Sequence, residues 1–196
     1  MSTDQNIDLK NNLKHFSIRI TSYRNNKFKF IADEMLGKIA RKLRIYGFDT
    51  AYIKDVLDDE ILKLGINENR IILTKDKIFF QKILRKNAKS IFLKNDLEIE
   101  NLVEIFLACK IYNISFSLLN SRCSICNGIL LKSKKQTKLN HNFTFNRKRS
   151  DMTLFECTNC HKIYWNGSHI KNIEKYILRI NKILDQHKPN KLIFSH

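Results

Sequence analysis

The pattern of apolar and polar positions changes at Lys27. Residues 1–26 are mostly polar and alternate only weakly around residues 15–23, so we interpret them as a partly disordered arm that could add one short strand. From Lys27 onward, short apolar runs alternate with segments whose apolar residues recur at helical spacing. The ordered part of the chain is therefore expected to begin at this point.

Four short segments have the composition of buried strands, namely residues 27–32, 50–53, 70–74 and 89–93. Helices are expected at residues 34–47, 58–65, 77–86, 97–112 and 168–186. Gly47 is a plausible stop for the first helix, and Asp58 a plausible N-cap for the second. Strands that alternate with helices of this length predict an α/β fold, with a mainly parallel sheet flanked by helices on both faces.

Four of the five cysteines form two C-x-x-C knuckles, CSIC and CTNC, with thirty residues between them. They are Cys123, Cys126, Cys157 and Cys160. A structural zinc ion takes four thiolates at tetrahedral corners, and each knuckle supplies two of them from one tight turn. Two disulfides or a redox pair are the alternative. If all four thiolates bind zinc, no position stays open for substrate, and the zinc is a structural element.

Other residues near the knuckles carry weaker signals. His161 and His169 could replace a cysteine ligand or contact nucleic acid. The fifth cysteine, Cys109, lies in an apolar helical segment and is interpreted as a buried thiol.

The chain is strongly basic, and its charges are unevenly distributed. Thirty-six Lys and Arg against 19 Asp and Glu give 36 − 19 = +17, which favours a polyanionic partner. An A/T-rich codon bias could account for part of the excess. Residues 31–118 hold 13 of the 19 acids, whereas residues 119–196 hold 15 basic and four acidic side chains. This partition predicts an acidic site in the middle of the chain and a basic surface at its end.

The segment between the knuckles is the most basic part of the chain. Residues 132–149 contain seven Lys and Arg and no acid, with Phe143 and Phe145 among them. Such a mixture suits contact with phosphates together with stacking on bases, although a solvated loop would have a similar composition.

Several acids follow the predicted strands. Asp33 comes directly after the first strand, Asp76 two residues after the third and Asp96 three residues after the fourth; Asp58, Asp59 and Glu60 open the intervening helix. The carboxyl ends of parallel strands meet at one edge of a sheet, where clustered carboxylates would repel one another without a cation. Oxygen ligands of this kind favour Mg²⁺ or Mn²⁺, and two such ions could activate water against a phosphodiester. The alternative is that these acids only cap helices.

Five segments resemble a known family. They are FIADEMLGKIARKLRIYGFDT, DDEIL, RIILTKD, RCSICNGIL and FECTNCHKIYWNGSHI. In this order they resemble the C-terminal RNase domain of the mut-seven exonuclease family, from about Lys27 to about Leu178. The resemblance implies a PIN-like nuclease fold followed by a zinc ribbon. The expected organisation is an N-terminal arm at 1–26, a PIN-like nuclease domain at 27–118, and a zinc ribbon with a basic insert and a C-terminal helix at 119–196.

The resemblance also assigns residues to roles. It implies metal-binding acids at Asp33, Asp59 and Asp76, with Asp96 as a looser match for a fourth acid, and it places the zinc ligands at the four knuckle cysteines. Glu60, beside Asp59, is a second-rank candidate acid. Residues that could reach substrate phosphates lie beside the acidic motifs and in the basic insert. They are Arg41, Arg44, Lys75, Lys134, Lys135, Arg147, Lys148 and Arg149.

The function expected from these observations is metal-dependent cleavage of RNA. The zinc ribbon is expected to bind the substrate strand. A further expectation is an association with a ribosome or ribonucleoprotein. The alternatives are a non-catalytic RNA- or ribosome-binding protein with the same fold, a DNA-directed nuclease and a toxin-like endonuclease. The longest uncharged stretch, residues 111–121, is far shorter than the ~20 apolar residues that span a bilayer, and no signal peptide is visible. The cytoplasm is therefore the expected compartment.

Overall fold

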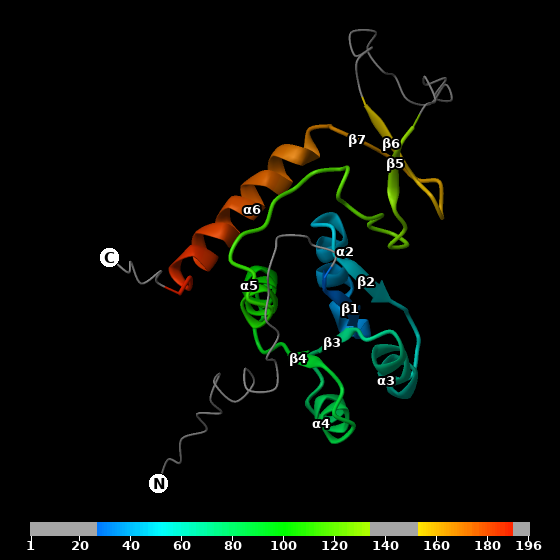
Figure 1. Cartoon of the computed structure of the whole chain (residues 1–196), viewed down its shortest axis with the longest axis vertical. Helices are drawn as coiled ribbons and strands as arrows, with labels where there is room; N and C mark the ends of the chain where they lie inside the picture. Colours follow the sequence, from blue (N-terminus) through cyan, green and yellow to red (C-terminus); the bar gives the residue numbers. More distant parts are fainter. Residues whose placement is uncertain (1–26, 134–152, 190–196) are drawn as a thin grey trace, which may run out of the picture.

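The computed structural model describes residues 27–133 and 153–189 (Figure 1). The expected N-terminal arm lies outside the described residues, and so do the predicted phosphate contacts of the basic insert at 134–149. Within the described residues, no helix is both long and apolar enough to cross a bilayer.

A four-stranded parallel sheet forms the centre of the protein. Its strands are β1 (Lys29–Ala32), β2 (Asp49–Tyr52), β3 (Ile71–Thr74) and β4 (Ser90–Phe92), in the order β2-β1-β3-β4. All three strand pairs are parallel, with Ile31 opposite Ala51 on one side and Ile72 on the other. The prediction of a parallel α/β sheet is confirmed.

Helices cover both faces of this sheet. They are the 3₁₀ helix η2 (Glu34–Leu36) and the α-helices α2 (Gly37–Ile45), α3 (Asp58–Asn67), α4 (Lys77–Arg85), α5 (Glu98–Ala108) and α6 (His169–Gln186). Successive strand residues point to opposite faces, so Ile31 and Ile72 pack under α3 and α4, whereas Phe30 and Leu73 pack under α2, α5 and α6. The two central strands, β1 and β3, therefore bury apolar side chains on both faces of the sheet, as in other buried parallel sheets.

Two predicted helices differ from the structure in ways that local chemistry explains. The helix expected at 97–112 ends at Ala108, because Lys110 adopts a left-handed conformation (φ 54°) and the amides of Lys110 and Ile111 close back onto the carbonyls of Leu107 and Phe106. At the start of α3, Leu57 occupies the N-cap position and Asp58 is the first helical residue. The expectation that Asp58 is the N-cap is therefore wrong.

The cysteines lie on a second, smaller sheet. Its antiparallel strands are β5 (Leu130–Lys132), β6 (Leu154–Cys157) and β7 (Ile163–Trp165), in that order. We call residues 121–133 and 153–165 the cysteine module. Helix α6 follows the module but returns to lie against α5 (Figure 1), where Ile177, Ile180 and Leu184 enter the main core. The terminal helix, which the sequence groups with the ribbon, thus packs as part of the α/β layer.

Candidate functional site

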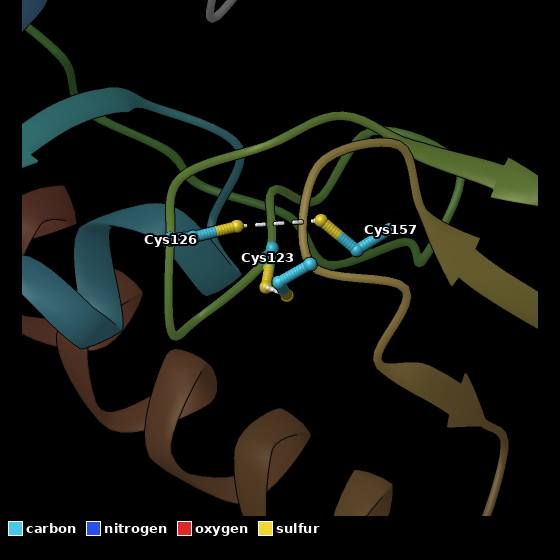
Figure 2. A group of neighbouring side chains, drawn as sticks. Cys123, Cys126 and Cys157 are labelled. Carbon is cyan, nitrogen blue, oxygen red and sulfur yellow. Dashed lines mark hydrogen bonds between the residues drawn. The ribbon is translucent and has the colours of Figure 1, made fainter.

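The four knuckle cysteines converge on one point. Their Sγ atoms all lie within 4.8 Å of one another, and those of Cys123 and Cys160 are 3.5 Å apart. The Sγ atoms of Cys126 and Cys157 are 3.4 Å apart (Figure 2). These separations are too long for disulfide bonds, whereas four thiolates at ~2.3 Å from a tetrahedral zinc ion would be about 3.8 Å apart. The residues present therefore fit a metal ion such as zinc, and neither His161 nor His169 belongs to the group.

The turns of both knuckles have the same local origin. The residue after the second cysteine of each knuckle, Asn127 or His161, has a positive φ of 67° or 59°. This conformation folds the chain back, so that the Asn127 amide bonds the Cys123 carbonyl and the His161 amide bonds the Cys157 carbonyl. Gly128 is required beside the first turn, since a Cβ there would lie 2.7 Å from Cys157 Sγ.

Tyr164 on β7 supports the cluster from outside. Its hydroxyl lies 3.0 Å from Cys123 Sγ and accepts a hydrogen bond of 3.2 Å from the Ser124 amide. Burial raises the pKa of the Cys123 thiol, but hydrogen bonds from Tyr164 and from backbone amides outweigh this and lower the pKa of Cys123 overall. The thiolate, which is the form that binds a metal, is thereby favoured at this ligand.

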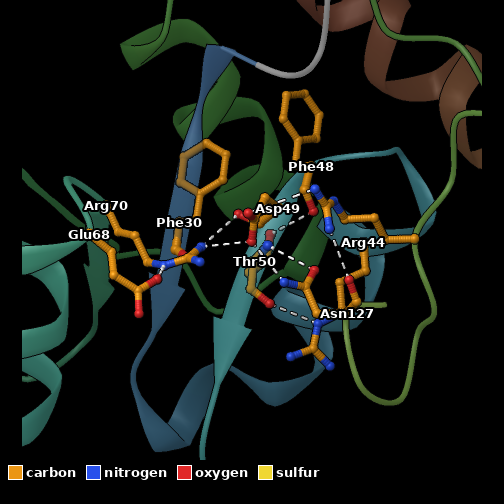
Figure 3. A network of polar contacts seen from close by, with 9 residues as sticks. Phe30, Arg44, Phe48, Asp49, Thr50, Glu68, Arg70 and Asn127 are labelled. Atoms are coloured by element: carbon orange, nitrogen blue, oxygen red, sulfur yellow. Dashed lines mark hydrogen bonds and ion pairs between the residues drawn. The ribbon is translucent and has the colours of Figure 1, made fainter. Parts of the chain in front are cut away.

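Arg44, at the end of α2, joins the cysteine module to the sheet. Its side chain is buried, with 4% of the residue exposed, and it donates to three backbone carbonyls (Figure 3). Nε bonds Thr50 O of β2 at 2.8 Å, while Nη1 bonds Ser124 O at 3.3 Å and Ile125 O at 2.9 Å. The expectation that Arg44 contacts substrate phosphates is therefore wrong, because its guanidinium is buried and hydrogen-bonded to backbone carbonyls of the protein itself.

Asn127 makes the reciprocal connection from the module to β2. Its Oδ1 accepts the Thr50 amide at 3.0 Å, and its Nδ2 donates to Asp49 at 2.7 Å (Figure 3). Asp49 also pairs with Arg70 at 2.7 Å. Since β2 is an edge strand, the knuckle occupies hydrogen-bonding groups that would otherwise be open at that edge.

Two predicted acids are connected at the carboxyl edge of the sheet by Thr74, the last residue of β3. The Thr74 hydroxyl donates to Asp33 Oδ2 at 2.7 Å and accepts the Asp76 amide at 2.9 Å. Asp33 Oδ1 also accepts the Glu34 amide at 2.6 Å, and Asp76 Oδ1 accepts the Ile78 and Phe79 amides at 2.6 and 2.8 Å. Both acids therefore cap helices, and both are held at fixed positions just beyond the carboxyl ends of neighbouring strands.

A third carboxylate, Asp58, lies in the electrostatic field of these two. Its pKa is raised by partial burial and by the negative charges of Asp33 and Asp76. The adjacent Asp59 instead pairs with Lys82 at 2.8 Å, and its side chain is 76% exposed. We call Asp33, Asp58 and Asp76 the acidic edge.

The ligand atoms of the acidic edge are not gathered around one point as those of the cysteine cluster are. Among residues 27–133 and 153–189, only the four cysteines form a group of three or more His, Cys, Asp or Glu ligand atoms placed to hold one ion. The pKa of Asp58 is nevertheless raised, first by partial burial and then by the charges of Asp33 and Asp76, so a cation near these carboxylates would favour the ionised form of Asp58.

The family model described as Mut7-C RNAse domain matches residues 28–177. This chain belongs to the Mut7-C family. The resemblance noted in the sequence is thereby confirmed, and the family associates the chain with RNA and with nuclease activity. No curated protein and no solved structure matches it.

The Mut7-C match spans the parallel sheet, the acidic edge and the cysteine module. Of the remaining predicted site residues, Asp96 and Glu60 are exposed, and Arg41 is exposed on α2. Lys75 donates to the Asn95 carbonyl at 2.5 Å, near the carboxyl end of β4.

Sequence reasoning gives Thr74 and Asn127 no role of their own at the two sites. It includes Asp58 among the clustered acids and interprets it as an N-cap, but it does not select it as a metal ligand. The T-x-D spacing from Thr74 to Asp76 could have signalled a hydroxyl that bridges two acids. The position of Asn127 directly after a C-x-x-C pair could have signalled a left-handed turn residue.

Proposed function

We propose that this protein is a Mg²⁺- or Mn²⁺-dependent ribonuclease whose reaction takes place at the acidic edge. The observation that carries the proposal is the Thr74 bridge, which fixes Asp33 and Asp76 side by side at the carboxyl ends of β1 and β3 in a Mut7-C chain. That end of a parallel sheet is where α/β proteins of this kind place their chemistry.

The hydrogen bonds of the two bridged acids leave oxygen lone pairs free. Asp33 accepts one bond at each carboxylate oxygen, and Asp76 accepts both of its bonds at Oδ1. Each carboxylate is oriented by backbone amides, so neither needs to reorganise to present an oxygen to a cation. Asp58 adds a third negative charge on a side chain that is exposed and can turn.

Divalent ions held by these carboxylates would supply a water of lowered pKa and would neutralise charge on the phosphate and the leaving oxygen. The chain's own contribution is to hold Asp33 and Asp76 in place through Thr74, and to concentrate negative charge where a cation is needed. Lys75 lies next to Asp76 in sequence and is directed by Asn95, so its charge stands close to where a phosphate would bind.

The cysteine module would act as a zinc ribbon that grips RNA. The proposal is supported by the cysteine geometry and by the basic residues of the insert in the printed sequence. The predicted role of Asp59 as a metal-binding acid and that of Asp96 as a fourth acid remain parts of this proposal. So do the predicted phosphate contacts, namely Arg41 and Lys75 beside the acids and Lys134, Lys135, Arg147, Lys148 and Arg149 in the insert.

The test is cleavage of labelled RNA and labelled DNA by the full chain with Mg²⁺, with Mn²⁺ and with a chelator. We compare the wild type with Asp33→Asn and use Asp185→Asn as the matched control, because Asp185 pairs with Lys188 on the exposed side of α6. Metal-dependent cleavage of RNA that falls at least ~100-fold in Asp33→Asn and persists in Asp185→Asn supports the proposal. Binding of RNA without cleavage under any of these conditions would instead favour a non-catalytic RNA-binding protein.

A further inference from the structure

The large apolar side chains that are most exposed lie beside the acids. Among the described residues, the three most exposed are Ile78, Leu57 and Met35, at 82%, 74% and 72%. Each is within two positions of one member of the acidic edge. Leu97, 59% exposed, likewise follows Asp96 at the end of the β4 connection. We call Met35, Leu57, Ile78 and Leu97 the aliphatic rim.

Local structure turns these side chains outward while their neighbours fill the core. On α4, Phe79 and Ile83 are buried, and Ile78 lies about 100° around the helix from Phe79. In η2, Leu36 is buried and Met35 is exposed. Met35 and Ile78 are therefore exposed beside neighbours that fill the core.

Two rim residues also occupy positions where a polar residue would stabilise the fold. Leu57 and Leu97 are the N-cap residues of α3 and α5, and neither helix has a side-chain cap hydrogen bond. A Ser, Thr, Asp or Asn at an N-cap is worth about 1 kcal/mol over an apolar residue. Exposed leucine at both positions disfavours folding and solubility, so its presence points to a ligand that covers it.

We propose that the aliphatic rim packs against the faces of unpaired bases on either side of the phosphodiester at the acidic edge, so that the protein takes single-stranded rather than duplex RNA. This proposal rests on the proposed function, because that function places the phosphodiester at the centre of the rim. An unpaired strand exposes apolar base faces, whereas a duplex stacks them inside and presents sugars and phosphates.

The charges around the rim fit the same occupant. Lys54, Lys77 and Lys94 are exposed and follow β2, β3 and β4 at the same edge of the sheet. They could meet flanking phosphates while the rim meets the bases. A protein partner at this edge would have to bring its own cations to three carboxylates, whereas an RNA strand arrives with divalent ions. RNA is therefore the occupant that the charges favour.

The experiment measures binding and cleavage by the full chain on three labelled probes: an unstructured RNA, the same strand annealed to its complement, and a strand of equal length that carries stable abasic sites. The test variant is Leu57→Ser combined with Ile78→Ser. Serine at position 57 adds a capping residue, so α3 is not weakened. The control is Leu178→Ser, which removes a leucine of similar exposure (68%) from the outer face of α6.

We expect the double variant to bind the unstructured RNA about tenfold more weakly than the wild type, with no change on the abasic strand or the duplex and no change in Leu178→Ser. An equal loss on the abasic strand would overturn the proposal, because the contacts would then be to the backbone. No loss on any probe would also overturn it and would leave a protein as the occupant of the rim. Cleavage assays distinguish this proposal from the proposed function. If the double variant binds and cleaves RNA like the wild type, only the role of the aliphatic rim is contradicted. If binding depends on the rim but neither the wild type nor the variant cleaves RNA, only the proposed ribonuclease activity is contradicted.

Discussion

Replacement of Arg44 tests how strongly the cysteine module and the parallel sheet depend on each other. In Arg44→Met the side chain keeps most of its length but loses the three hydrogen bonds to Thr50, Ser124 and Ile125. Burial lowers the pKa of Arg44, and the nearby negative charges of Cys123 and Cys126 oppose this, so the guanidinium stands next to the proposed metal ligands. The substitution therefore removes both a mechanical tie and a compensating charge.

The magnitude follows from the acceptors that are left behind. An unsatisfied buried acceptor costs about 1–3 kcal/mol, and removal of a buried charge gives part of this back as relieved desolvation. We expect Arg44→Met to lower the free energy of unfolding of the metal-bound protein by about 3 kcal/mol, which is a large fraction of the 5–15 kcal/mol typical of folded domains. Without metal, the Ser124 and Ile125 carbonyls can turn to water. Only the Thr50 bond is then lost, for about 1 kcal/mol.

The two expected losses of stability also determine the change in zinc affinity. Because linkage is reciprocal, a destabilisation that is about 2 kcal/mol larger in the metal-bound than in the metal-free protein requires that Arg44→Met bind zinc about 30-fold more weakly than the wild type. The assay is urea unfolding with zinc and with a chelator, together with competition for zinc against a coloured chelator. Arg41→Met, an exposed arginine on the same helix, is the control.

Two results would refute the reasoning. If Arg44→Met destabilises the protein equally with and without zinc, then the arginine does not couple the module to the sheet. If it costs no more than Arg41→Met, then the three hydrogen bonds contribute no net stability.

Three further predictions concern charge and metal. Asp58→Asn should raise the stability of the metal-free protein at neutral pH by less than ~1 kcal/mol, since it removes charge repulsion at an exposed, screened site. It should also reduce cleavage more than Asp59→Asn does. Thermal unfolding and cleavage assays check both effects, and a destabilised Asp58→Asn would contradict the first. Although burial raises it, hydrogen bonds from Arg70 and Asn127 hold the pKa of Asp49 below its usual 3.8, so the stability that Asp49 adds is present above about pH 4 and is lost as the pH falls through the folded pKa. Urea unfolding at decreasing pH should thus show a shallower loss in Asp49→Asn than in the wild type, and equal slopes would argue against the pairing. Removal of zinc by a chelator should lower the free energy of unfolding by more than ~2 kcal/mol. It should also change the fluorescence of the single tryptophan, which lies on β7. An unchanged unfolding curve would show that the cysteines hold no metal.

Much of the architecture was predictable because local patterns and long-range packing agree. The apolar runs ending at Ala32 and Thr74 are buried on both sides in the structure, as the parallel-sheet prediction requires. The apolar pattern predicts a helix after Phe92 that is too long, since Ile111 and Tyr112 continue this pattern after Lys110 has turned the chain. The spacing of apolar residues predicts which positions are buried, but it does not predict that a single residue such as Lys110 adopts a left-handed backbone conformation.

The sites were predictable only where spacing alone carries the chemistry. The cysteines were found because a C-x-x-C pair is a local unit, and their convergence follows from strand pairing between β5 and β6. The sequence pattern predicts an exposed Arg44, because the apolar spacing of a helix does not show that residues 121–133 cover that part of α2. The choice between Asp58 and Asp59 depends on a helix phase of one residue, which sequence reasoning does not fix.

Cleavage by Asp76→Asn is the most direct test of the central claim that the acidic edge is a metal-dependent ribonuclease site. Asparagine caps a helix as well as aspartate does, so Oδ1 can still accept the Ile78 and Phe79 amides and α4 should remain folded. We expect this variant to bind labelled RNA like the wild type but to cleave it at least ~100-fold more slowly with Mg²⁺ or Mn²⁺. Cleavage at the wild-type rate by a correctly folded Asp76→Asn would contradict the account.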